Sequence, residues 1–196
     1  QKKLSEFHEE LKRMNIKIIR PDINECFANF TAKENNFYYA LGAIKNVGYE
    51  SISNVVKERI KNGIFKNLFD FISRTDPKDI NKLQLEGLVK AGAFDCFTSN
   101  RKSLLESIPN LILKSKSLFE DKLINQINLF DENKSNNQNE LLKNINDFAF
   151  EERLSKEFET LGFFISDHPL NQFKDFFPQY NIVNFSNFNL DEKAKE

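Results

Sequence analysis

Several residue types are scarce in this sequence, and their scarcity excludes some classes of protein. Tryptophan is absent, methionine occurs once, and cysteine and histidine occur twice each. Cys26 and Cys96 show no metal-ligand spacing and no disulfide framework, so we expect two small core residues of a reduced, cytoplasmic protein. No apolar run reaches the length of a membrane span, and the chain opens at Gln1 without a secretory leader. These features predict an excised cytoplasmic segment with no membrane partner.

Groups that could carry catalysis are also missing. The sequence has no Asp-x-Asp pair, no glycine-rich phosphate loop and no Cys/His pair. His168 precedes Pro169 in an expected turn, where a structural role is the simpler explanation. The sequence therefore predicts a segment that is not catalytic alone, with no catalytic residue, no metal ligand and no cofactor of its own.

Apolar surface is sufficient for a core, because 40% of residues are hydrophobic and 21 of them are phenylalanine. The spacing of these residues predicts a mainly α fold with a few short strands. Helices are expected over residues 4–14, 49–61, 67–74, 76–90 and 101–125, with a later helical stripe of Leu154, Phe158 and Leu161. Short strands are expected over residues 16–20, 37–41 and 163–165. In the helix over 49–61, the expected buried face consists of Ile52, Val55, Val56 and Ile60.

Residues 41–48, Leu-Gly-Ala-Ile-Lys-Asn-Val-Gly, have the pattern of a helix-hairpin-helix. Two apolar residues flank a tight turn, and a glycine opens the following helix. Unpaired N–H groups and the positive helix dipole at that end favour a bound phosphate. Gly48 would let the phosphate approach without a Cβ, and Asn46 is expected at positive φ. These eight residues alone also fit an ordinary loop before a helix.

Charge is sorted along the chain. The net charge is −1, so nucleic-acid binding must depend on a local basic patch. Residues 44–66 carry five basic residues against two acidic ones, whereas residues 131–159 carry four against eight. The basic residues of the first stretch are Lys45, Lys57, Arg59, Lys61 and Lys66. The candidate DNA contacts of the first hairpin are Lys45, Asn46, Val47, Gly48 and Lys57.

Residues 89–94, Val-Lys-Ala-Gly-Ala-Phe, form a poorer second hairpin pattern. For this stretch alone, a helix C-cap at Gly92 and a core position for Phe94 explain the sequence better. Paired with the first hairpin, it predicts a tandem unit that contacts both DNA backbones without reading sequence. Lys90 and Gly92 are then further candidate DNA contacts.

Residues 126–130, Gln-Ile-Asn-Leu-Phe, match the pattern of peptides that dock on a bacterial sliding clamp. Ile127, Leu129 and Phe130 would be its apolar residues, and Gln126 would hydrogen-bond through its amide. Ile127 and Phe130, together with Phe119 and Leu123, also fit one face of an amphipathic helix packed on the core. Both interpretations stay open from the sequence.

The order of these motifs along the chain resembles that in the family of alpha subunits of bacterial replicative DNA polymerase III. The matching stretches are residues 21–24, 39–48, 69–71, 81–82, 88–95, 126–130, 161–164 and 168–170. The resemblance implies a parent protein that is a DNA-directed DNA polymerase using magnesium and deoxynucleoside triphosphates, with its catalytic aspartates in a palm domain upstream. It implies duplex DNA, the sliding clamp (beta subunit) and other subunits of the replicative holoenzyme as partners.

The resemblance also implies a division of the chain. Residues 1–40 would end the fingers region, and residues 41–110 would form the tandem helix-hairpin-helix unit. Residues 111–178 would be the clamp-binding region, including a polar, flexible linker over 131–146. Residues 179–196 would lead toward a following oligonucleotide-binding domain.

Two other functions fit some of the residues. A stand-alone helical scaffold could pack its hairpins on protein and never meet DNA, and the net charge of −1 keeps this interpretation open. An independent enzyme is disfavoured, because the sequence has no acid/base or metal constellation.

Overall fold

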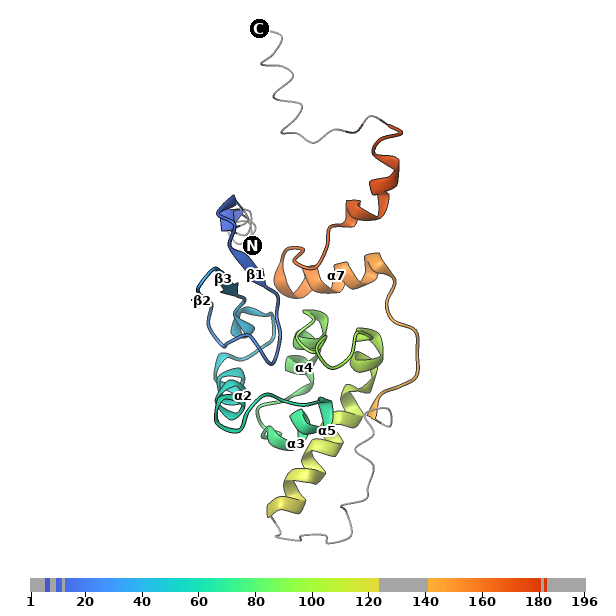
Figure 1. The fold of residues 1–196 in the computed structure, drawn as a ribbon. Coiled ribbons are helices and arrows are strands. Elements are labelled where there is room, and N and C mark those ends of the chain that lie inside the picture. The colour runs from blue at the N-terminus through green and yellow to red at the C-terminus, as the bar shows by residue number, and fades with distance from the viewer. Residues whose placement is uncertain (1–5, 8–9, 12, 124–140, 181, 183–196) are drawn as a thin grey trace. The chain divides into compact units, whose positions relative to one another are not determined.

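The computed structural model describes residues 6–7, 10–11, 13–123, 141–180 and 182 (Figure 1). The expected clamp peptide, residues 126–130, lies outside the described residues. The chain divides into two compact units, residues 1–165 and residues 166–196, and each is treated by itself below. In the described part of the chain, no helix combines the length and the apolar character that a membrane crossing requires.

The mainly α fold is confirmed, and its helices carry most of the first unit (Figure 1). The described part of this unit contains the helices η1 (Leu41–Ala43), α2 (Tyr49–Asn62), α3 (Leu68–Arg74), α4 (Lys82–Lys90), α5 (Arg101–Leu123) and α7 (Phe150–Leu161). Residues 6–7, 10–11 and 13, within the helix expected over 4–14, are also helical. Helix α5 runs without a break through residue 110, where the resemblance places a functional boundary. That boundary and those at residues 40 and 178 stay predictions.

A small sheet precedes the first hairpin. It consists of β1 (Lys17–Ile19), β2 (Thr31–Lys33) and β3 (Asn36–Tyr38) in the order β1-β3-β2. Strand β1 pairs parallel and β2 antiparallel with the central β3. The strand expected over residues 163–165 does not form; instead the Phe163 ring packs 6.0 Å from that of Tyr39, centroid to centroid.

Asparagine side chains cap the N-termini of α3, α4 and α5. The side chains of Asn67, Asn81 and Asn100 each accept a hydrogen bond from the backbone N–H three residues later. This satisfies one of the donors that a helix start leaves unpaired. The helix expected from residue 76 therefore starts only at Lys82, because the Asp76 carboxylate closes a separate turn by accepting from the N–H two residues on.

Phenylalanine side chains form the centre of the core. The rings of Phe65 and Phe71 lie 5.2 Å apart and those of Phe71 and Phe94 lie 5.0 Å apart, both edge to face. All three side chains are fully buried. Burial of each ring contributes about 1.5–3 kcal/mol to stability. Because the three rings come from the α2–α3 loop, α3 and the α4–α5 loop, their contacts pack these three segments together.

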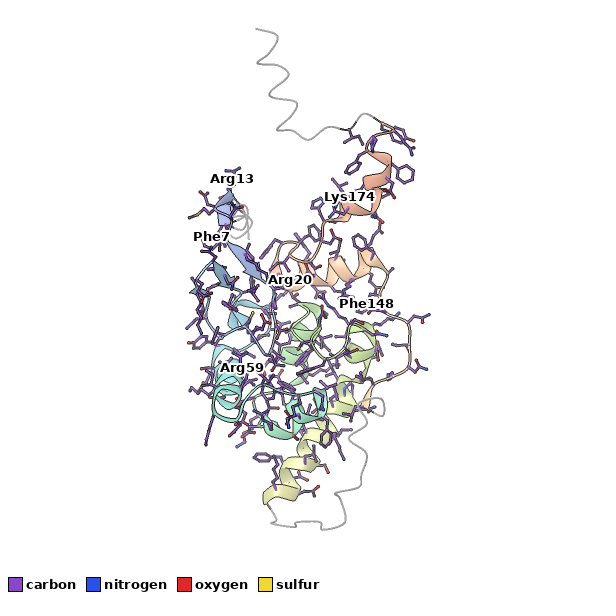
Figure 2. The ribbon with its side chains drawn as sticks, viewed as in Figure 1. Phe7, Arg13, Arg20, Arg59, Phe148 and Lys174 are labelled. Atoms are coloured by element: carbon purple, nitrogen blue, oxygen red, sulfur yellow. The ribbon has the colours of Figure 1, made fainter. Side chains whose placement is uncertain are left out.

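One position of the predicted buried face of α2 is wrong. The first three apolar residues are buried, but Ile60 is 68% exposed. Arg59 of α2, labelled in Figure 2, is buried in its place. The Arg59 guanidinium donates to the Ile23 carbonyl at 2.6 Å and lies over the Phe27 ring. Burial lowers the pKa of Arg59 from its usual value. Arg59 therefore does not belong to the exposed basic patch.

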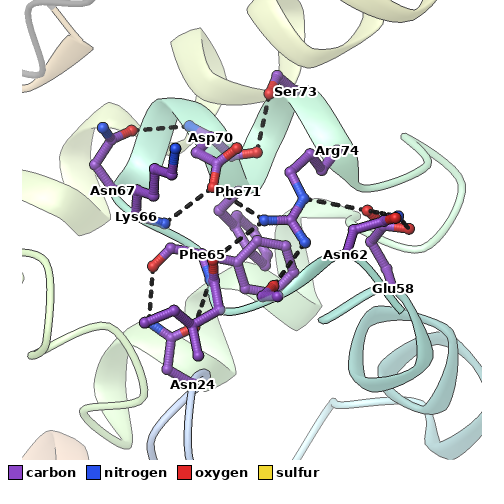
Figure 3. A network of polar contacts seen from close by, with 12 residues as sticks. Asn24, Glu58, Asn62, Phe65, Lys66, Asn67, Asp70, Phe71, Ser73 and Arg74 are labelled. Carbon is purple, nitrogen blue, oxygen red and sulfur yellow. Dashed lines mark hydrogen bonds and ion pairs between the residues drawn. The ribbon is translucent and has the colours of Figure 1, made fainter. Parts of the chain in front are cut away.

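A second arginine, Arg74, holds the loop between α2 and α3 through several contacts (Figure 3). The Arg74 guanidinium lies 4.5 Å from the centre of the Phe65 ring and pairs with Glu58 and Asp70, each at 3.1 Å. From the other side, the Asn24 amide bonds both the N–H and the carbonyl of Phe65. These contacts fix the end of α2 relative to α3.

Helix α7 differs from its expected apolar stripe. Leu154 and Leu161 are buried as predicted, but Phe158 is 44% exposed. Its ring packs on Phe164 at the surface. The fully buried residue of this turn is Glu157, whose carboxylate lies 3.6 Å from the Arg101 guanidinium. Because the buried Arg101 of α5 lies opposite, α7 buries Glu157 at this turn instead of Phe158, which the apolar periodicity favours.

The last six residues of the expected linker, 141–146, lie against α5. The Lys143 N–H donates to the Ser107 hydroxyl at 2.9 Å, and the Asn100 amide donates to the Ile145 carbonyl at 2.6 Å. Leu141 also packs against the core. Residues 131–140 of that linker lie outside the described residues.

The two cysteines differ. Cys26 is buried, as predicted, and burial raises the pKa of its thiol to about 12. Cys96 is exposed, so its expected core position is wrong.

The second unit contains η3 (Pro169–Phe176) among its described residues. His168 caps this helix, because its Nδ1 accepts from the Leu170 N–H at 3.2 Å. The structural role expected for His168 is confirmed.

Candidate nucleic-acid interface

The first hairpin is a tight turn between two buried anchors. Ile44 and Val47 are buried, and the Val47 N–H donates to the Ile44 carbonyl at 3.1 Å. Asn46, the third residue of the turn, has a φ of 68°, as the sequence predicts. Asparagine and glycine adopt this conformation at least cost. The turn thereby exposes Lys45, Asn46 and Gly48 while its apolar residues face the core.

Helix α2 begins directly after this turn with unpaired donors. Gly48 is its N-cap and offers no side-chain oxygen. Within the part of the chain that the structure describes, nothing accepts a hydrogen bond from the N–H groups of residues 48–51. Gly48 is exposed, with an ordinary φ of −71°, so it is suited to close approach and not required by a special backbone conformation. A row of four donors is therefore open to an acceptor from outside.

Two neighbouring helices hold the hairpin in place. A Cβ on Gly87 of α4 would lie 2.6 Å from the Lys45 carbonyl oxygen and 3.3 Å from Val47 Cγ2. Only glycine lets α4 approach this closely. On the other side, the Lys45 N–H donates to the Thr160 carbonyl of α7 at 3.1 Å. The hairpin is thus a rigid support and not a loose loop.

Sequence reasoning missed Gly87 and Thr160. A glycine inside a helix costs about 1 kcal/mol relative to alanine, so Gly87 was a signal for close packing. No sequence signal identifies Thr160, because its backbone carbonyl makes the contact.

The second hairpin differs from the first. Gly92 is buried with a φ of 84° and follows α4, whose C-terminus is closed by the Ala93 N–H donating to the Leu88 carbonyl at 2.9 Å. A Cβ on Gly92 would collide with the Arg101 guanidinium. Gly92 thus ends α4 directly after the C-cap residue Ala91, which agrees with the capping role that the sequence allows, and Phe94 occupies the expected core position.

The helix after the second hairpin has acceptors of its own. At the start of α5, the Lys102 N–H donates to the Asp147 carboxylate at 3.0 Å and the Ser103 N–H donates to the Asn100 side chain at 2.9 Å. A carboxylate of this chain thus lies where an external phosphate would bind. DNA contacts of Lys90 and Gly92 stay predictions. Of the two hairpins, the first alone leads into a helix whose initial N–H groups have no acceptor among the described residues.

The candidate lysines have different surroundings. Lys45 and Lys57 are exposed. The Lys90 ammonium instead pairs with Glu159 of α7 at 3.1 Å, and its hydrogen bond holds the pKa of that carboxyl below its usual range. Lys45 also acts on Glu159 through its charge. Because Lys45 is exposed and lies in the turn that precedes α2, it is the candidate cation for a phosphate at the open donors.

Among the described residues, no cluster of three or more histidine, cysteine, aspartate or glutamate side chains could hold a metal ion. The predicted clamp residues Gln126, Ile127, Leu129 and Phe130 lie outside the described residues, so their role stays a prediction.

Comparison with known proteins gives the family. A family model described as a helix-hairpin-helix motif matches residues 15–104. The DNA polymerase III subunit alpha of Caulobacter vibrioides is 36% identical over 168 residues, covering 86% of this chain and 15% of the relative. That of Borreliella burgdorferi is 35% identical, covering 93% of this chain and 16% of the relative. That of Buchnera aphidicola subsp. Schizaphis graminum is 38% identical, covering 94% and 16%. The chain therefore belongs to the DNA polymerase III alpha subunit family and corresponds to a segment of about 15% of the length of these relatives.

Proposed function

We propose that this chain binds the backbone of duplex DNA through the first hairpin, as a segment of a cytoplasmic replicative DNA polymerase. The open N–H groups of residues 48–51 are the observation that carries the proposal. They would donate to a phosphate of one strand, and Lys45 would add a positive charge beside it. Because such contacts involve no base edge, binding would not depend on sequence.

The contrast between helix starts supports this assignment. Helices α3, α4 and α5 have asparagine caps, whereas α2 has a glycine. Helix α7 also lacks a side-chain cap, but two acids in its first turn would repel a phosphate. Helix α2 has a single acid there, Glu50, with Lys45 in the adjoining turn.

The whole protein's activity lies beyond this segment. As a member of the family, the full-length protein would carry out DNA-templated DNA synthesis with magnesium and deoxynucleoside triphosphates, within a replicative holoenzyme. Residues 126–130 would dock on the sliding clamp. This tether would raise the effective concentration of the polymerase at the primer end and so sustain processive synthesis.

Charge reversal at the hairpin tests the DNA contact. We expect Lys45→Glu to weaken binding of any duplex by about tenfold at low salt and to lower the salt slope of log K by about 1. Fluorescence anisotropy with two duplexes of unrelated sequence measures both quantities. Lys114→Glu is the matched control, because Lys114 is exposed on α5. Equal losses for the two variants, or no duplex binding by the unaltered chain, would contradict the proposal.

A further inference from the structure

The side chain of Gln84 is buried beside the start of α2, and none of the described residues forms a hydrogen bond with it. Gln84 is the third residue of α4 and is 8% exposed. Its Oε1 is buried without a partner, and no described residue bonds its Nε2. This Nε2 lies 3.1 Å from the position that a Cβ would occupy on Gly48, the N-cap of α2. A polar amide is therefore held against the open end of α2.

Local structure does not explain this amide. The cap of α4 uses only the backbone of Gln84, whose N–H donates to Asn81 at 3.0 Å. A buried amide without a partner destabilises the fold, and nearly all buried polar groups in proteins are bonded. An apolar side chain of the same length would fill the space without that penalty. The Nε2–H of this amide can donate to an acceptor from outside the chain, whereas the buried Oε1 is itself an acceptor and would gain no bond from an anion.

The position of Nε2 specifies the acceptor. It lies next to Gly48, where the four unpaired N–H groups of residues 48–51 begin. An acceptor held by those N–H groups is negatively charged, and hydrogen bonds to a charged acceptor are about twice as strong as those between neutral groups. An anion at the start of α2 would therefore be within reach of the amide.

We propose that Gln84 is a direct ligand of the DNA phosphate held at the start of α2, donating its Nε2–H to one phosphate oxygen. This inference depends on the proposed function, because it concerns the same phosphate. It adds a donor from α4 to those from α2. The phosphate is then held by two helices, which fixes the direction in which the backbone crosses the hairpin. Gly48 has a second role here, since any Cβ would crowd this amide.

A conservative substitution separates binding from structure. Gln84→Met keeps the length of the side chain and removes the donor. We expect duplex affinity to fall about tenfold, while the thermal midpoint stays unchanged or rises because an unpartnered polar group is removed. Gln84→Glu should weaken binding further, because its carboxylate would compete for the same N–H groups. Leu83→Gln is the control, since Leu83 is exposed on the same helix.

Each outcome has a distinct meaning. Wild-type affinity in Gln84→Met or Gln84→Glu, alongside weakened binding in Lys45→Glu, would overturn the Gln84 inference and leave the proposed function intact. A joint fall of affinity and thermal midpoint in Gln84→Met would identify a structural role and would also overturn it. Absence of duplex binding by the unaltered chain would instead contradict the proposed function itself.

Discussion

Replacing Arg101 with methionine is expected to lower the free energy of unfolding by about 3–5 kcal/mol, the cost typical of breaking a buried ion pair. Arg101 is 4% exposed and lies between two acids. Its guanidinium donates to Asp95 at 2.7 and 2.8 Å and to the Lys90 carbonyl at 3.1 Å. It also lies 3.6 Å from the fully buried Glu157. The substitution would leave that carboxylate in the core without its counter-charge.

The electrostatics of this site agree with that expectation. Burial alone would lower the pKa of Arg101, but hydrogen bonds and charge from Asp95, together with the charge of Glu157, outweigh it and raise the pKa. Asp95 also pairs with Arg153 of α7 at 3.1 Å. The pair therefore belongs to a network that joins α7 to the α4–α5 loop. Because α7 supports the first hairpin through Thr160, the variant should also weaken duplex binding.

Denaturant unfolding of the variant measures this effect. Lys143→Met is the control, because its ion pair with Glu106 is about half exposed and is expected to contribute less than about 1 kcal/mol. The double variant Arg101→Met, Glu157→Met should recover part of the loss, since it removes both buried charges. A loss for Arg101→Met no larger than that of the control would show that the network does not stabilise the fold.

The second large effect concerns the predicted clamp peptide. Leu129→Ala combined with Phe130→Ala is expected to weaken binding to the clamp ring by at least about 100-fold, because two apolar anchors that each contribute about 2 kcal/mol are lost. Isothermal titration calorimetry measures the affinity. Asn128→Ala is the matched control within the same segment and should bind like the unaltered chain.

The same variant distinguishes the two interpretations of this segment. If residues 126–130 are a docking peptide, the thermal midpoint should not change. If they instead form a helix face packed on the core, the variant should lose thermal stability. Unchanged clamp affinity would contradict the docking proposal directly.

The sequence was sufficient to predict those features that depend on neighbouring residues. The positive φ of Asn46 follows from turn chemistry, and the burial of Leu154 and Leu161 follows from helical spacing. Periodicity failed where a distant partner decides burial. Arg59 displaces Ile60 from the core because the Ile23 carbonyl accepts its hydrogen bond. Glu157 displaces Phe158 because Arg101 lies opposite.

The candidate site divides in the same way. Both hairpins were found from local pattern, but the pattern could not distinguish open donors from occupied ones. Asp147, more than forty residues after the second hairpin, accepts the N–H that the pattern alone would assign to DNA. Gln84 carries no motif and is identified only by its burial and its distance from Gly48.

The most direct test is to titrate the ¹⁵N-labelled chain with a short duplex and to follow the amide signals by NMR. It asks whether the N–H groups at the start of α2 bind the DNA backbone. We expect the amide signals of residues 48–51 to shift together and to saturate with one dissociation constant, with smaller shifts for the capped starts of α3 and α5. Duplex binding that leaves the signals of residues 48–51 in place while those of other surface residues shift would contradict this account.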